Sequence, residues 1–159
     1  MGTKFSEPDR RSLKHCSIIA LNFNGERIIE KCLSHLLNQT YPNFEIIVVD
    51  NNSTDDSLPI LQKYLPSRKI SVVRNKKNLG VPRGRNLGVL HARGEIIAFI
   101  DNDGYAHPNW LEEAVNTIES DERIGAVGSL VFFNRKKTVV NGAGGTLNLQ
   151  GYGGDICFN

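Results

Sequence analysis

The stretch FEIIVVDNNSTDDS, residues 44–57, joins an apolar, β-branched run to a polar segment rich in residues that cap helices. Apolar runs of this kind are typical of strands that are buried on both faces of a parallel sheet. Asn, Ser, Thr and Asp side chains accept hydrogen bonds from the free N–H groups of a helix's first turn. The stretch therefore predicts a strand that ends near residue 50 and a helix that follows it, with a start that Pro59 blurs.

The same rhythm recurs along the chain. The other strand-like runs are CSIIALN (16–22), KISVVRN (69–75) and EIIAFID (95–101). Each run precedes a segment with helical spacing of apolar residues. The first helix is predicted over 25–38, and Pro82 and Pro108 can open the third and fourth helices. The inward stripe of the first helix is predicted to be Ile28, Ile29, Cys32, Leu33, Leu36 and Leu37.

Alternating strands and helices predict the fold class. Right-handed crossovers give an α/β fold with a mostly parallel, Rossmann-like sheet flanked by helices on both faces. After about residue 124 the pattern changes to short strand-like runs, with a β-hairpin turn expected at NRKK (134–137) and a glycine-rich stretch at 142–154. We expect residues 1–15 to form a disordered or extended leader. Residues 16–159 then form a single domain that is incomplete at its C-terminus.

Composition excludes several classes of function. The 159 residues are 40% hydrophobic and 23% charged, which is ordinary for a soluble globular protein, and the formal net charge of +2 is too small to indicate nucleic-acid binding. Three cysteines without a C-x-x-C pair favour a reducing, cytoplasmic setting over a disulfide framework or a zinc site. No G-x-G-x-x-G follows the first strand and no P-loop sequence occurs, so the common nucleotide-binding fingerprints are missing.

Two carboxylates stand where the fourth predicted strand ends, in the stretch FIDNDG (99–104). Asp101 and Asp103 are separated by one residue, and two ionised carboxylates held that close repel each other unless a cation or strong donors lie between them. Mg²⁺ takes few protein carboxylates and completes its shell with water and phosphate oxygens. The pair therefore predicts a metal–phosphate site. The alternative is that one Asp caps the next helix and the other solvates a turn.

Two further stretches lie at predicted strand ends. In NKKNLGVPRGRNLGVLHARG (75–94), Gly80, Gly84 and Gly88 recur every four residues, so on a helix they form one smooth face. A helix N-terminus with nearby arginines is a natural anion site, although a solvated basic face is the plainer alternative. Asp50 and Asn51 follow the second strand, where Asn or Asp can bond a base edge or only cap a turn.

These stretches together resemble the family 2 glycosyltransferases with the GT-A fold. The matching segments are SIIALNFNGERIIEKCLSHLLNQTYPNFEIIVVDNNSTDDS, NLGVPRGRNLG and AFIDNDGYAHPNWLEEAV, and the resemblance covers roughly residues 16–118. The resemblance implies transfer of a sugar from a nucleoside diphosphate donor to an acceptor hydroxyl, with inversion. The match of Asp101-Asn102-Asp103 to the D-x-D motif implies that Asp103 holds Mg²⁺ or Mn²⁺ on the diphosphate. Asp101 would contact the ribose, or the metal through water.

The resemblance also implies a donor pocket. Arg85 matches the arginine of the family's N-x-G-x-x-x-x-R-N-x-G stretch, which implies a contact with base or phosphate, and Asp50 and Asn102 join the expected donor-binding set. The backbone around Leu21, Asn22 and Phe23, together with Asn51, matches the nucleobase pocket. Many relatives carry Asp at the position of Asn51. An amide can still accept from the N3–H of uracil or thymine, so UDP or dTDP donors are favoured.

One expected residue has no match. Relatives carry a general base in a Glu-Asp type motif downstream of D-x-D, whereas the chain has one acidic residue after residue 122, Asp155, in a context that does not match. Deprotonating the acceptor needs a base within hydrogen-bond reach, directly or through one water. We therefore expect this chain to hold the donor half of the site without the base. The catalytic base itself is unknown.

Two alternatives remain open at this stage. A nucleotide-sugar-binding module without turnover would keep the donor site, and a haloacid-dehalogenase-like phosphatase would use the first Asp of FIDNDG as its nucleophile. The phosphatase motif normally follows a first strand, whereas three strand–helix units precede it here. The resemblance also implies a lipid-linked or polymeric glycan as acceptor and peripheral association with the inner membrane face. It leaves a homo-oligomer open.

Overall fold

The computed structural model describes residues 13–133, 136–142, 145–147 and 153–155. Contacts divide the chain into two compact units, Met1–Glu112 and Glu113–Asn159. The expected leader lies almost wholly outside the described residues. The division into a leader and one domain therefore stays a prediction.

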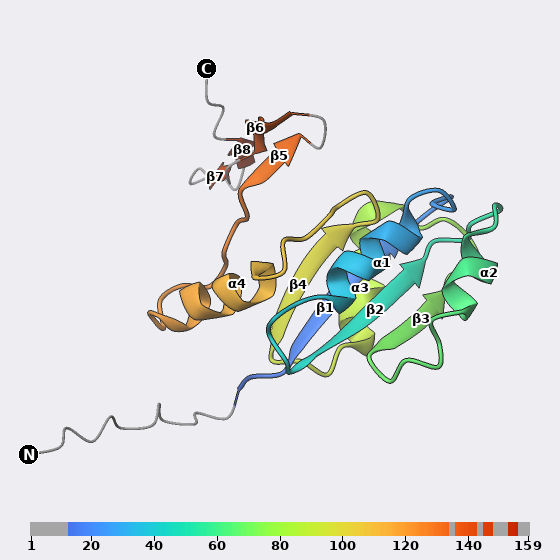
Figure 1. Cartoon of the computed structure of the whole chain (residues 1–159), viewed down its shortest axis with the longest axis horizontal. Helices are drawn as coiled ribbons and strands as arrows, with labels where there is room; N and C mark the ends of the chain where they lie inside the picture. The colour runs from blue at the N-terminus through green and yellow to red at the C-terminus, as the bar shows by residue number, and fades with distance from the viewer. Residues whose placement is uncertain (1–12, 134–135, 143–144, 148–152, 156–159) are drawn as a thin grey trace, which may run out of the picture. The chain divides into compact units, whose positions relative to one another are not determined.

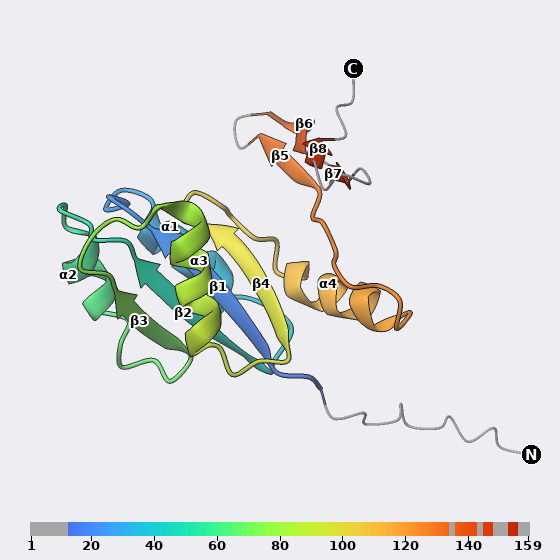
Figure 2. The ribbon, with the colours of Figure 1, turned by 180° about the vertical axis from the view of Figure 1, so that it is seen from behind.

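The first unit contains a four-stranded parallel sheet with the order β3-β2-β1-β4 (Figure 1). Its strands are β1 (Cys16–Asn22), β2 (Phe44–Asp50), β3 (Ile70–Arg74) and β4 (Ile96–Asp101). The connecting helices are α1 (Ile29–Leu37), α2 (Ser57–Gln62) and α3 (Gly80–His91). Figures 1 and 2 view the molecule from opposite sides and show α1 on one face of the sheet and α3 on the other. The predicted α/β architecture is confirmed.

The two central strands match their predicted bounds. Every residue of β1 and β2 is buried, because each strand has a neighbour on both sides and covered faces. The edge strands β3 and β4 are partly exposed and shorter than the predicted runs 69–75 and 95–101. A strand at the edge of a sheet pairs on one side only, so apolar patterning marks its ends less sharply.

Helix α1 begins later than predicted and helix α3 begins earlier, because hydrogen bonds in the preceding turns set where each helix starts. Helix α1 begins at Ile29 rather than residue 25, since Gly25 O accepts from Ile28 N and Ile29 N in a turn before it. Helix α3 begins at Gly80 rather than Pro82, with the Gly80 N–H donating to Asn78 Oδ1 at 2.8 Å. Pro82 is tolerated there because the first turn has no intrahelical partners for its N–H groups. In the predicted stripe of α1, four members are buried: Ile29, Cys32, Leu33 and Leu36.

Helix α3 packs tightly on the sheet. Ile19 of β1 and Val49 of β2 belong to a buried cluster on this face of the sheet, against which α3 residue Leu87 packs. A Cβ added at Gly88 would lie 2.5 Å from Ile19 Cγ2 and 3.2 Å from Val49 Cγ2. Gly84 approaches Leu21 equally closely. The predicted smooth glycine face therefore allows α3 to lie against β1 and β2.

Gly88→Ala is expected to lower the free energy of unfolding by about 1–3 kcal/mol, because the new methyl group overpacks a buried β-branched neighbour. The effect should appear even though alanine favours a helix over glycine by about 1 kcal/mol. Urea denaturation of the whole chain measures it. Gly125→Ala is the matched control, since nothing lies within 4 Å of a Cβ there. Equal stability of the two variants would contradict the close approach of α3.

The second unit holds most of α4 (Trp110–Glu119) and two antiparallel strand pairs. Strand β5 (Val131–Phe133) pairs with β6 (Lys136–Gly142), and β7 (Gly145–Leu147) pairs with β8 (Gly153–Asp155). The predicted hairpin region is confirmed. Of the turn expected at NRKK, residues 134–135 lie outside the described residues and Lys136 and Lys137 begin β6, and much of the glycine-rich stretch also lies outside the described residues. Helix α4 begins at Trp110 rather than Pro108, because Trp110 N donates to His107 O in a turn. Among the described helices, none is both long and apolar enough to cross a membrane.

Candidate functional site

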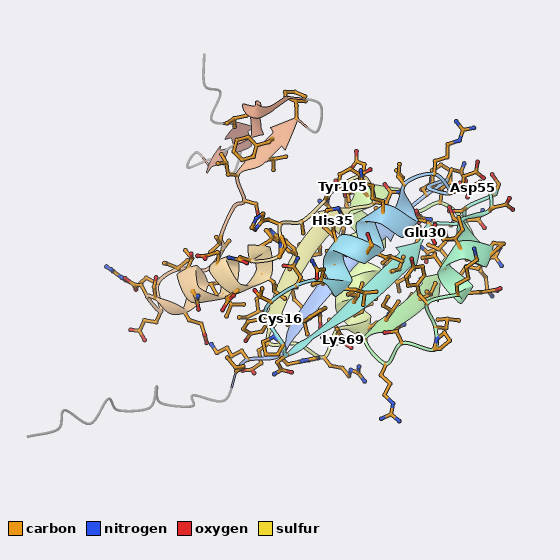
Figure 3. The ribbon with its side chains drawn as sticks, in the orientation of Figure 1. Cys16, Glu30, His35, Asp55, Lys69 and Tyr105 are labelled. Atoms are coloured by element: carbon orange, nitrogen blue, oxygen red, sulfur yellow. The ribbon has the colours of Figure 1, made fainter. Side chains whose placement is uncertain are left out.

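The carboxyl edge of the parallel sheet gathers the predicted site residues. In register, Asn22 of β1 pairs with Asp50 of β2, and Leu21 pairs with Asp101 of β4. Open parallel sheets bind ligands beyond this edge. The strand arrows in Figure 1 point toward it, and Asp55, labelled in Figure 3, lies in the loop that follows β2. The fold therefore brings three separate stretches of sequence together.

Asp50 is turned into the protein. Its side chain is fully buried, and Oδ1 accepts hydrogen bonds from Asn22 Nδ2 at 3.1 Å and from the Ser53 hydroxyl. Its other oxygen, Oδ2, accepts from the Ser53 N–H at 3.1 Å. This carboxylate caps the turn after β2, which is one of the two roles that the sequence left open.

Asn51 is also fully engaged. Its Oδ1 accepts from Asn75 Nδ2 at 2.8 Å and from the Leu79 N–H at 3.0 Å, and its Nδ2 donates to Asn78 Oδ1 at 2.8 Å and to Gly80 O at 3.3 Å. An asparagine amide offers two donors and two acceptors, so all four are used. In this arrangement Asn51 holds the start of α3. To contact the nucleobase of a donor, its side chain would have to break one of these hydrogen bonds.

Arg85 of α3 reaches the end of β4. Its Nη2 donates to Asp101 Oδ1 at 2.7 Å, and its guanidinium carbon lies 5.7 Å from the centre of the Phe99 ring. The Asp101 side chain is 56% exposed, so this ion pair lies at the surface of the edge. Arg85 Nε is buried without a hydrogen-bond partner among the described residues. The guanidinium of Arg85 thus has one N–H donor, at Nε, that no described residue accepts.

The D-x-D segment forms a tight turn after β4. The Gly104 N–H donates to Asp101 O at 2.9 Å, and the middle residue, Asn102, points inward, with its Nδ2 donating to Asn22 Oδ1 at 2.9 Å. Asp103 is exposed, and its carboxylate makes no hydrogen bond or ion pair to any residue that the structure describes. The turn therefore presents one carboxylate that is paired and one that is open to solvent.

Cys32 lies beneath this turn, a placement that the helical stripe alone did not reveal. Its Sγ lies 3.8 Å from Asp101 O. Burial, together with the smaller effects of the nearby charges of Asp103 and Asp101, raises the pKa of the Cys32 thiol to about 12. The thiol is therefore protonated at neutral pH, and a protonated thiol is neither a nucleophile nor a metal ligand.

Aromatic and cationic groups hold the chain just after the turn against α1. Figure 3 labels His35 and Tyr105, whose ring centroids lie 5.4 Å apart, and Lys31 Nζ lies 4.3 Å from the centre of the Tyr105 ring. His35 Nδ1 is 3.1 Å from Ala106 O. These contacts support the turn from the side of α1.

Hydrogen bonds join the loop after β1 to the segment after β2, a contact that the sequence did not predict. The Gly25 N–H donates to Ser57 Oγ at 2.9 Å and the Glu26 N–H donates to Asp55 Oδ2 at 2.9 Å. Burial acts to raise the pKa of Asp55, but hydrogen bonds from Ser57 and the Glu26 N–H outweigh it and the pKa is lowered. Of the expected pocket residues, Leu21 packs into the core and Phe23 remains 45% exposed at the loop.

An open parallel sheet with a carboxylate turn and an arginine at its carboxyl edge defines an α/β domain suited to a phosphate-bearing ligand. Residues 17–150 match the family model described as glycosyl transferase family 2. The chain belongs to this family. The phosphatase alternative fails on the same grounds, because FIDNDG lies at the end of the fourth strand, inside the glycosyltransferase match.

Known proteins agree with this assignment. An uncharacterised glycosyltransferase of Haemophilus influenzae is 34% identical over 144 residues, which is 90% of this chain and 43% of that protein. Staphylococcus aureus TarS 1–349, in complex with UDP-GlcNAc, superposes with a TM-score of 0.63 at 33% identity over 68% of this chain and 32% of that one. The mannosyltransferase PcManGT of Pyrobaculum calidifontis, in complex with GDP-Man and Mn²⁺, gives 0.68 at 26% identity over 83% and 39%. The chain thus spans less than half the length of these relatives.

Proposed function

We propose that this chain binds the nucleoside diphosphate sugar of a glycosyltransferase reaction at the carboxyl edge of its parallel sheet. The observation that carries the proposal is the turn after β4, where Asp103 is exposed and Asp101 is paired with Arg85. Two structural neighbours support it, because one was solved with UDP-GlcNAc and the other with GDP-Man and Mn²⁺. UDP or dTDP are the favoured donors, since the neighbour with the higher sequence identity, 33% against 26%, was solved with UDP-GlcNAc.

The residues at this edge fit a divalent metal with a diphosphate. Among the described residues no three His, Cys, Asp or Glu side chains gather into a metal site, so the protein would supply only one or two carboxylates and the donor would supply other ligands. Asp103, with Asp101 beside it, would hold Mg²⁺ or Mn²⁺, whose other ligands are donor phosphate oxygens and water. A metal held there would supply positive charge against the negative charge that develops on the diphosphate leaving group. The guanidinium of Arg85, which is partly exposed, adds positive charge for an anion at the same edge.

The transfer itself needs one group more than the donor site provides. With inversion, the acceptor oxygen bonds to the anomeric carbon as the bond from that carbon to the diphosphate breaks, and the hydroxyl proton passes to a base. Asp155 is the single acidic residue after residue 122 in the chain. We propose that this chain supplies the donor half of the site and that donor binding survives better than transfer. A lipid-linked or polymeric glycan stays the predicted acceptor.

Metal-dependent stabilisation by nucleotides tests the proposal. Melting of the whole chain is followed with UDP, dTDP or GDP, each with and without Mn²⁺. A ligand present at 100 times its dissociation constant stabilises a protein by about 2.7 kcal/mol, which is a shift of roughly 5–10 °C for a chain of this size. We expect that shift with UDP and Mn²⁺ together and little with either alone. Equal stabilisation with and without metal would contradict the role of the D-x-D turn.

A binding module without turnover is the second candidate, and the missing match to the general base favours it. Release of UDP from UDP-GlcNAc, by transfer or hydrolysis, separates the two. Turnover that Asp103→Ala removes would exclude the binding-only function. Binding without any release would favour it.

A further inference from the structure

Asn102, the middle residue of the D-x-D turn, is bonded to the interior rather than to solvent. Its Nδ2 donates to Oδ1 of Asn22, which is fully buried at the end of β1, at 2.9 Å. The two flanking carboxylates lie at the surface instead, since Asp103 is exposed and Asp101 forms an exposed ion pair with Arg85. The hydrogen bond of Asn102 therefore anchors the turn from within.

The orientation of this bond is set by a second partner of Asn22. Its Nδ2 donates to Asp50 Oδ1 and to Ser53 Oγ, each at 3.1 Å. An ionised carboxylate only accepts hydrogen bonds, so Asn22 must turn its NH₂ group toward Asp50 and its oxygen toward Asn102. A chain of hydrogen bonds thus runs from the turn after β4, through the end of β1, to the turn after β2.

Gly25 lies directly on the Asn22–Asn102 bond. A Cβ added at this position would overlap both Asn22 Oδ1 and Asn102 Nδ2. The backbone of Gly25 does not have a positive φ, so alanine there would push the two asparagine side chains apart by contact and would not strain the backbone. The Gly25 N–H is itself fastened to Ser57 Oγ at 2.9 Å. The hydrogen bond between the two asparagines therefore requires a residue without a side chain at position 25.

We propose that Asn102 and Asn22 are positioning residues, which with Gly25 hold Asp101 and Asp103 outward for the metal and donor. This inference rests on the proposed function for its consequence but not for its geometry. It departs from the sequence-based expectation that Asn102 and Asn22 belong to the donor-binding set. Losing one neutral hydrogen bond in such an anchor changes an equilibrium by up to roughly tenfold.

The first arm of the test uses the donor-free chain and is independent of function. Side-chain amide resonances of Asn102 are assigned by NMR, and their hydrogen exchange is compared with that of Asn109, an exposed residue. We expect slowed exchange at Asn102 and loss of that protection in Gly25→Ala. If Asn102 exchanges as fast as Asn109 in the unaltered chain, the anchoring bond is absent and the inference is overturned.

The second arm measures the dissociation constant of UDP in saturating Mn²⁺ for Asn102→Ala, Gly25→Ala and the double variant. We expect each single variant to bind roughly tenfold more weakly, and the double variant to bind no more weakly than either, because both remove one interaction. Additive losses would mean that Asn102 contacts the donor itself, which contradicts a positioning role. Asn109→Ala is the control and should bind normally.

The two arms separate failure of the inference from failure of the proposed function. If the unaltered chain does not bind UDP with Mn²⁺, the proposed function fails, and the exchange measurement still decides the inference. Should Gly25→Ala not fold, as judged by its melting curve, the exchange rate in the unaltered chain decides the anchoring bond. Binding by Asn102→Ala with unchanged affinity would then overturn its positioning role.

Discussion

Asp103→Ala is expected to weaken Mn²⁺-dependent binding of UDP by roughly 100-fold or more, since loss of residues that merely support a metal ligand already reduces affinity 10- to 100-fold. Asp103 is exposed and its carboxylate has no hydrogen-bond or ion-pair partner among the described residues. Its removal should therefore leave the folded state intact. Titration calorimetry with UDP in the presence and absence of Mn²⁺ measures the change.

Two companion variants sharpen this result. Asp103→Asn keeps the shape of the side chain and removes its charge, so it should lose metal-dependent binding nearly as completely. Glu95→Ala removes the same charge from the residue before β4, at the opposite end of the sheet, and should bind UDP normally. Retained metal-dependent binding in Asp103→Ala would mean that the carboxylate does not hold the metal. A comparable loss in Glu95→Ala would indicate an effect of net charge only.

The sequence was informative where burial alone decides structure. The runs 16–22 and 44–50 became β1 and β2 with the same bounds, because central strands of a parallel sheet are apolar on both faces. Helix starts were missed because they depend on turns and side-chain acceptors, near or far in sequence, that the spacing of apolar residues does not mark. The N–H of Leu79, for example, donates to Asn51 Oδ1, 28 residues away.

The candidate site shows the same limit. Parallel register brought Asn22, Asp50 and Asp101 to one edge, as strand ends predict. The direction of each side chain could not be inferred from sequence, because it depends on hydrogen-bond partners in other loops. Asp50 points inward and caps its own turn, and the side chain of Asn51 is hydrogen-bonded at the start of α3. Polar residues at strand ends thus predict where a site lies better than they predict which of them face the ligand.

A second polar cluster, at the opposite end of the sheet, supports the fold. Glu45 of β2 is 6% exposed, and its Oε1 accepts from Ser17 Oγ at 2.8 Å and from the Arg93 N–H at 2.9 Å. Its Oε2 accepts from the guanidinium of Arg93, and the Gly94 N–H donates to Ser17 Oγ at 2.8 Å. The carboxylate therefore fastens the connection between α3 and β4 to the first residues of β1 and β2.

Glu45→Ala is expected to lower the free energy of unfolding at pH 7 by roughly 2–4 kcal/mol, because it leaves the buried Ser17 hydroxyl and the Arg93 N–H without an acceptor. The lower end of this loss falls below the roughly 3–5 kcal/mol for breaking a fully buried ion pair, because the Arg93 side chain is 75% exposed and its guanidinium can bond to water instead. Urea denaturation measures the loss. Glu95→Ala is again the control and should change stability by less than about 0.5 kcal/mol.

Acid should remove the contribution of Glu45. Burial acts to raise its pKa, but hydrogen bonds from Arg93 and Ser17 outweigh burial and hold the pKa below the ordinary value of 4.5. The unfolded chain then binds the proton first as the pH falls, so the stabilisation is complete above pH 4.5 and declines toward the lower pKa of the folded state. The difference in stability between the unaltered chain and Glu45→Gln should therefore shrink below pH 4.5. A difference that grows on acidification would mean that Glu45 is protonated in the folded protein, and the hydrogen bonds from Arg93 would then not be those of an ion pair.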